Sequence, residues 1–147
     1  MPASPRDPVS HPAMLLAHIT SALPRMLAQL RTWVEVESPS SEPARVQSLA
    51  REVAAAFEAA GCRARFHESA LELAYPGTRD ADDAPILLLG HLDTVYPAGT
   101  LPAMPFRIVD EGAAGRGEMG GAAGRAYGPG VFDMKAGVVQ ALFALQA

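Results

Sequence analysis

The chain has 147 residues, 49% of them hydrophobic and 19% charged, which is enough apolar material for the core of one ordinary domain. Its formal net charge is −4 and its Lys and Arg residues are scattered, so nucleic acid is not an expected partner. No apolar run approaches the roughly 18 residues of a membrane span, and no signal-peptide pattern is present. A single cysteine, Cys62, cannot form an internal disulfide, and we expect a soluble cytoplasmic protein.

The N-terminal part predicts a leader followed by a helix. Residues 1–12 are rich in proline and polar residues, which is typical of a flexible leader. Apolar residues then recur at helical spacing from Leu23 to Val34 and predict an amphipathic helix that extends upstream. Pro24 is expected in a first turn opened by Ser21.

A second helix and two strands are predicted next. Ser41 is expected to cap a helix with Pro43 in its first turn, and Gly61 ends that helix. Residues 62–67 alternate apolar and polar side chains, which indicates a half-buried strand, and residues 72–75 are expected to pair beside it. Cys62, between Gly61 and Arg63, is interpreted as a small buried hydrophobe rather than a nucleophile.

The C-terminal half contains the most apolar strand candidate. After an acidic loop, the apolar run 86–89 favours a central strand covered on both faces. Residues 106–111 and 125–127 predict two further strands, joined by a glycine-rich hairpin loop over residues 112–124. From about Lys135 the composition is helical.

A His-x-Asp triplet follows the apolar run directly. Binding groups in open α/β sheets collect beyond the carboxyl ends of central strands, so His91 is expected at a ligand site. The two-residue spacing places His91 and Asp93 on one side of an extended chain, where a carboxylate can orient a metal-binding imidazole. The alternative is that His91 ends a strand and Asp93 caps the turn that follows.

A second candidate motif, GPGVFDMKAG, lies about forty residues downstream. It places Asp133 just ahead of a helix, among glycines that permit close backbone approach: Gly128, Gly130 and Gly137. Alternatively, Asp133 is an N-cap and Lys135 is a solvated helix residue. The turn is also compatible with an anion-binding loop at a helix N-terminus, although it lacks the Walker spacing.

Together these motifs resemble a known enzyme family. GHLDTVYPAGTL, then PFRI, then AYGPGVFDMKAG is similar to the co-catalytic zinc family that includes glutamate carboxypeptidase, acetylornithine deacetylase and succinyl-diaminopimelate desuccinylase. The resemblance covers much of residues 86–147 and extends more weakly to residues 34–40, between the first two predicted helices. DTVYPAGT and PF are most similar to the glutamate carboxypeptidase branch.

The resemblance implies specific roles. His91 becomes a zinc ligand, Asp93 the catalytic carboxylate that orients it, and Asp133 the carboxylate that bridges two metal ions. Two divalent cations about 3.5–4 Å apart polarise a scissile carbonyl and lower the pKa of the attacking water. The implied cofactor is Zn²⁺, two per complete site, with Co²⁺ or Mn²⁺ as alternatives. A cis peptide bond between Asp133 and Met134 is also implied.

Several family features have no counterpart in the chain. The family carries an adjacent Glu pair, a further acidic ligand and a late histidine after this helix, and also a dimerisation domain. His11, His18 and His67 lie upstream without the matching context and are interpreted as surface or helix-face residues. The glycine-rich loop over residues 112–124 is longer than the usual pattern.

We therefore expect an α/β fold, a three-layer sandwich with a mixed sheet between helices, incomplete because the C-terminal part of the catalytic domain is missing. Residues 13–147 would be the N-terminal portion of a zinc-peptidase catalytic domain. The predicted function is that of a metallopeptidase of the glutamate carboxypeptidase type. Its substrate would be an N-acyl amino acid or a short peptide with a C-terminal glutamate. We expect the chain alone to be inactive, and the full-length enzyme to form a homodimer through a domain absent here.

Three alternatives remain at this level. The enzyme could be a deacetylase or desuccinylase of a biosynthetic amino-acid intermediate. From a different class, the chain could be a non-catalytic α/β binding module that holds an anion at its Gly-Pro-Gly turn. A third interpretation is a degenerate remnant that folds poorly, because a sheet without its later strands exposes an apolar edge.

Overall fold

The computed structural model describes residues 12–76, 85–110 and 124–146. His11 and most of the predicted leader, acidic loop and glycine-rich hairpin loop lie outside these residues. The described elements are, in chain order, α1 (Pro12–Glu35), α2 (Pro43–Ala59), β1 (Arg63–Phe66), β2 (Leu71–Ala74), β3 (Arg107–Asp110), β4 (Gly124–Tyr127), the π-helical turn η2 (Val131–Lys135) and α3 (Ala136–Leu145).

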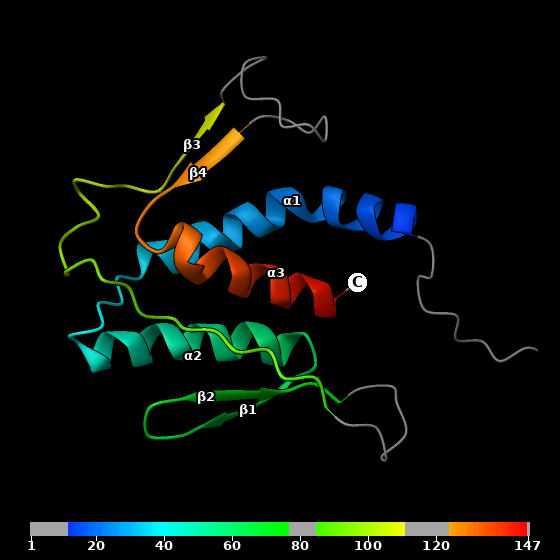
Figure 1. Cartoon of the computed structure of the whole chain (residues 1–147), viewed down its shortest axis with the longest axis horizontal. Helices are drawn as coiled ribbons and strands as arrows, with labels where there is room; N and C mark the ends of the chain where they lie inside the picture. The colour runs from blue at the N-terminus through cyan, green and yellow to red at the C-terminus, as the bar shows by residue number, and fades with distance from the viewer. Residues whose placement is uncertain (1–11, 77–84, 111–123, 147) are drawn as a thin grey trace, which may run out of the picture.

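The three helices form the middle of the molecule (Figure 1). In this view α1 and α3 lie side by side above α2, with the β3–β4 hairpin at the top and the β1–β2 hairpin at the bottom. The core joins apolar faces of the helices to single residues from the connections; its buried members include Trp33, Val34, Leu49, Val53, Phe106, Val139 and Leu142. Within the described residues, no helix combines the length and apolar character needed to cross a membrane.

Helix α1 confirms the predicted helical periodicity, but it begins well before Ser21, which was expected to open its first turn. Because α1 starts at Pro12, Pro24 lies inside the helix and not in its first turn. A proline there removes one backbone N–H donor from the helical ladder. Ser21 does not open the helix either; its hydroxyl donates to the carbonyl of His18 at 2.7 Å.

Helix α2 confirms the predicted element and corrects its cap. The N-cap is Glu42, without a side-chain capping hydrogen bond, so the prediction that Ser41 caps this helix is wrong. Pro43 does stand in the first turn, where its missing N–H costs no helical hydrogen bond. After the helix, Gly61 adopts a φ of +95°, a backbone conformation that favours glycine.

Both hairpins form where the sequence predicted strands. β1 pairs with β2 and β3 pairs with β4, each antiparallel, in two separate two-stranded sheets. Cys62 is buried before β1 as expected, whereas Phe66 at its end is 52% exposed. Side chains of a four-residue strand are buried only where another element covers them.

The apolar run 86–89 differs from the prediction of a central strand. These residues form no strand, and their side chains are 71% to 87% exposed. A covered strand needs ladder partners on both sides, and the described residues supply none. The α/β class is confirmed, but the described strands form two small antiparallel sheets and not one mixed sheet between helical layers.

Burial of Cys62 leads to a first prediction. Burial raises the pKa of its thiol, and only 7% of the residue is exposed, so both the thiolate population and its access to reagents are low. We expect iodoacetamide to alkylate Cys62 in the native chain at least about tenfold more slowly than in the urea-unfolded chain. Mass spectrometry of timed samples measures both rates. Equal rates would show that Cys62 is accessible and not part of the core.

Candidate functional site

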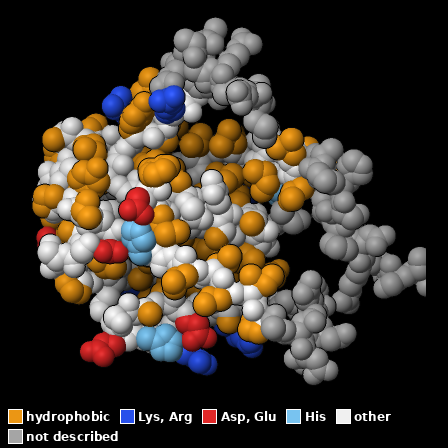
Figure 2. Space-filling model, viewed as in Figure 1, with side chains coloured by type: hydrophobic (Ala, Val, Ile, Leu, Met, Phe, Trp, Pro, Cys, Tyr) orange, Lys and Arg blue, Asp and Glu red, His pale blue; other side chains and the backbone are white. Residues whose placement is uncertain are grey.

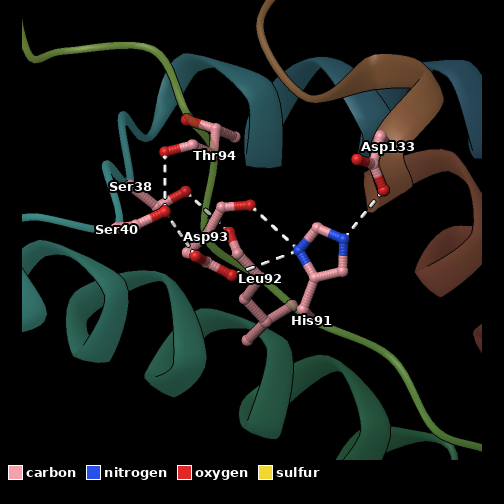
Figure 3. A network of polar contacts seen from close by, with 7 residues as sticks. All are labelled: Ser38, Ser40, His91, Leu92, Asp93, Thr94 and Asp133. Atoms are coloured by element: carbon pink, nitrogen blue, oxygen red, sulfur yellow. Dashed lines mark hydrogen bonds and ion pairs between the residues drawn. The ribbon is translucent and has the colours of Figure 1, made fainter.

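The structure brings His91, Asp93 and Asp133 together at one site (Figure 3). His91 and Asp93 lie in the irregular segment after residues 86–89, and Asp133 lies in η2. Nε2 of His91 is 2.8 Å from Oδ1 of Asp133, and Nδ1 is 3.1 Å from Oδ1 of Asp93. The imidazole therefore stands between two carboxylates from distant parts of the chain.

The contacts of the imidazole shift the pKa of His91 upward. The contact with Asp133 and, less strongly, the backbone carbonyl of Asp93 at 3.1 Å raise the pKa of His91, while partial burial opposes them. The side chain of Asp133 stays 80% exposed, so its carboxylate is accessible to a ligand. Asp93 is more enclosed, at 37%, and its pKa is lowered chiefly by a hydrogen bond from Ser40.

The loop of His91 is held by the connection between α1 and α2. Pro39 and Thr94 form an isolated parallel β-bridge. Thr94 donates its N–H to the carbonyl of Ser38 at 2.8 Å, and Ser40 donates its N–H to the carbonyl of Thr94 at 2.9 Å. The buried Ser38 hydroxyl donates to the carbonyl of Leu92 at 2.7 Å. From the sequence, the serines of this connection were predicted only to break a helix. The weak family similarity of residues 34–40 was the one indication that they contribute to the site.

Glu37 fixes the other end of the same loop. Its carboxylate accepts the N–H of Gly99 at 2.8 Å and the N–H of Leu101 at 3.0 Å. These two hydrogen bonds lower the pKa of Glu37, with the bond from Gly99 as the largest cause. The loop after His91 is thereby tied at two points to one connection.

Two glycines allow η2 to approach the site, as their spacing predicted. Gly128 has a φ of +150° and Gly130 a φ of +71°. A Cβ atom on Gly128 would lie 2.9 Å from Cγ1 of Val34, and one on Gly130 would lie 2.6 Å from Cγ2 of Thr94. Any larger residue would push the turn away from α1 and from the His91 loop.

Asp133 is not a helix N-cap and Lys135 is not a solvated helix residue, which were the alternatives for these two positions. Asp133 has non-helical backbone angles, its peptide bond to Met134 is cis, and no side-chain capping bond is formed at either η2 or α3. Lys135 is not solvated, since only 1% of the residue is exposed. Its Nζ donates to the carbonyls of Trp33 at 2.9 Å and Val36 at 3.0 Å. The ammonium group therefore binds the carbonyls at the end of α1, where a positive charge is favourable.

A cleft of about 280 Å³ opens over the site. One wall is formed by residues 93–96 and the other by residues 131–133, with His91 between them. Two large apolar side chains border it in nearly full exposure, Val95 at 91% and Phe132 at 97%. The described lining contains no Lys or Arg. On the face drawn in Figure 2, the basic side chains lie towards the upper and lower edges.

The donor atoms fit a metal ion in part. Nε2 of His91 and the Asp133 carboxylate are adjacent donors, and the Asp93 carboxylate on Nδ1 is the orienting contact that metal-binding imidazoles usually have. In the part of the chain that the structure describes, no group of three or more His, Cys, Asp or Glu residues could hold a metal ion. His67 pairs with Glu72 on the β1–β2 hairpin, and neither it nor His18 lines the cleft.

The two carboxylates are expected to contribute unequally to the His91 pKa. Asp133→Asn should lower the His91 pKa more than Asp93→Asn, because the Asp133 bond is the largest cause and much of the Asp93 effect comes from a backbone carbonyl that Asn retains. NMR titration of the ring protons in the three metal-free proteins measures this order. A larger drop in Asp93→Asn would contradict the geometry.

Burial of Lys135 predicts a specific pH dependence of stability. Its pKa is lowered from 10.5 to about 8, chiefly by burial. Between these values the unfolded chain binds a proton that the folded chain has lost. The free energy of unfolding should therefore increase with pH in that window, by at most about 3 kcal/mol.

Urea unfolding of the wild type and Lys135→Met at about pH 7.5 and about pH 10 tests this expectation. Other titrating groups are common to both proteins and cancel in the difference. The same change with pH in both proteins would show that Lys135 does not carry the effect.

A family model matches the part of the chain that carries the site. Residues 87–147 match the model of Peptidase family M20/M25/M40. The matched region contains His91, Asp93 and Asp133, together with η2 and α3. No curated protein matched the chain. This match over residues 87–147, the region that contributes all three of these residues, agrees with the resemblance seen in its motifs.

Proposed function

We propose that this chain forms part of a zinc-dependent amide hydrolase in which His91 and Asp133 are metal ligands and Asp93 orients His91. The observation that carries the proposal is the imidazole held between two carboxylates, with Nδ1 on Asp93 and Nε2 facing Asp133. A divalent metal at such a site supplies Lewis acidity for the scissile carbonyl and for the attacking water. The residues of the chain supply its position.

The cleft supports a small substrate. Val95 and Phe132 are almost fully exposed on its two walls, where an acyl or side-chain group of the substrate could cover them. The described lining offers no Lys or Arg for the carboxylate of an N-acyl amino acid or a C-terminal glutamate. Recognition of that carboxylate, and the choice between a carboxypeptidase and a deacetylase or desuccinylase, would depend on other residues.

Charge argues against the anion-binding alternative. Two carboxylates, Asp93 and Asp133, line the cleft beside the Gly-Pro-Gly turn, with no described Lys or Arg to balance them. Lys135, the single lysine of the sequence, binds main-chain carbonyls instead. A phosphate at this turn would face the negative charge of these two carboxylates, with His91 as the cationic partner already shared between them.

The donor set predicts weak metal binding and no turnover by the chain alone. With His91 and Asp133 as the only proposed ligands, a metal ion would lack the four donors of a tight site. The described lining also contains no further carboxylate to act as a general base.

Calorimetric titration of the chain with zinc sulfate tests the assignment. We expect weak binding that is lost in His91→Gln and Asp133→Asn, and no hydrolysis of N-acetylglutamate with zinc present. His67→Gln is a matched control, because His67 is also an exposed imidazole paired with a carboxylate, at 2.9 Å from Glu72.

Three results would overturn parts of the proposal. Unchanged zinc binding by His91→Gln removes His91 as a ligand. Tight binding of two ions by the wild type contradicts the incomplete donor set. Phosphate-induced NMR shifts of the Gly130 amide, without any response to zinc, would favour the binding module.

A further inference from the structure

The Ser40 hydroxyl makes a contact that the proposed function does not use. Ser40 is exposed and lies in the connection before α2, 53 residues from Asp93 in the sequence. Its Oγ donates to Oδ2 of Asp93, the carboxylate oxygen that does not contact His91. Ser40, Asp93 and His91 thus form a continuous chain of side-chain hydrogen bonds that ends at Nε2 (Figure 3).

The carboxylate is the better of two acceptors for this hydroxyl. Oγ also lies 3.1 Å from the carbonyl oxygen of Thr94, but a hydroxyl has one proton to donate. Oδ2 is the nearer of the two and carries charge, and hydrogen bonds to ionised acceptors are the stronger ones. The proton is therefore expected on the side of Asp93.

This contact limits the rotation of the Asp93 side chain. A carboxylate held only through Oδ1 can turn about its side-chain bonds, whereas one held at both oxygens has a single favourable orientation. That orientation keeps Oδ1 within reach of Nδ1 of His91 and so directs Nε2 towards Asp133.

We propose that Ser40 is a positioning residue that orients His91 through Asp93. The inference rests on the proposed function, since it concerns the residue that orients the proposed metal ligand. Ser40 itself touches neither His91 nor Asp133 in the contacts of Figure 3.

The backbone bridge allows the hydroxyl to be tested separately. Ser40→Ala removes the bond to Asp93 but keeps the N–H of residue 40 on the carbonyl of Thr94 at 2.9 Å, so the connection stays attached. Ser38→Ala is the matched control, because it removes a hydroxyl from the same bridge that binds the Leu92 carbonyl and not the carboxylate. Ser40→Thr restores a hydroxyl at the same position.

Two measurements on the 147-residue chain form the test. In the metal-free protein, NMR scalar couplings give the χ1 rotamers of Asp93. The ratio of major to minor rotamers should fall about threefold to tenfold in Ser40→Ala, as expected for the loss of one hydrogen bond. It should stay near the wild-type value in Ser40→Thr and Ser38→Ala. Zinc affinity, measured with zinc sulfate, should fall about tenfold in Ser40→Ala alone.

The outcomes separate this inference from the proposed function. Unchanged Asp93 rotamers in Ser40→Ala overturn the positioning role, whatever zinc does. An equal loss of rotamer order in Ser38→Ala also overturns it, because the effect would then belong to the bridge as a whole. If the wild type binds no zinc, the proposed function fails, while the rotamer ratios still decide the role of Ser40.

Discussion

Two backbone hydrogen bonds, from Thr94 to Ser38 and from Ser40 to Thr94, join the connection after α1 to the loop that carries His91 and Asp93. The same stretch of chain receives Lys135, whose Nζ binds the carbonyls of Trp33 and Val36. The loop of His91 and the turn of Asp133 are therefore both attached to the same segment, the C-terminal end of α1 and the residues that follow it. Without these contacts to the end of α1, the irregular loop that carries His91 and the kinked turn that carries Asp133 would share no attachment point.

Charge is distributed unevenly around this segment. The ammonium group of Lys135 is buried, binds carbonyls and does not line the cleft, so it does not neutralise the carboxylates there. Asp93 and Asp133 both face His91, which raises the pKa of the imidazole. An imidazole and two carboxylates in an otherwise cation-free described lining form an environment that attracts a divalent cation more readily than an anion.

Much of the fold followed from local patterns. Helical spacing predicted α1 and α2, and composition predicted α3. Alternation predicted β1, and short strand-like segments near turn residues predicted the other strands, because these signals arise between residues close in sequence. The prediction failed where the outcome depended on distant partners. The apolar run 86–89 has the composition of a buried strand, but a strand is completed by neighbouring strands, and the described residues pair none with it. The cap of α2 moved from Ser41 to Glu42 because Pro43 and the preceding turn set where the helix begins.

At the site, the sequence by itself singled out the residues that we propose to carry the chemistry, and glycines that permit close approach. His91 and Asp93 share a two-residue spacing, and Asp133 follows a Gly-Pro-Gly turn, so each motif was visible within a short window. Only the tertiary structure decided what supports them. The bond from Ser40 to Asp93 spans 53 residues, and that from Lys135 to the Trp33 carbonyl spans 102. Such contacts leave no periodicity in the sequence, because a serine in a loop and a lysine ahead of a helix look the same whether solvated or bound to a distant segment.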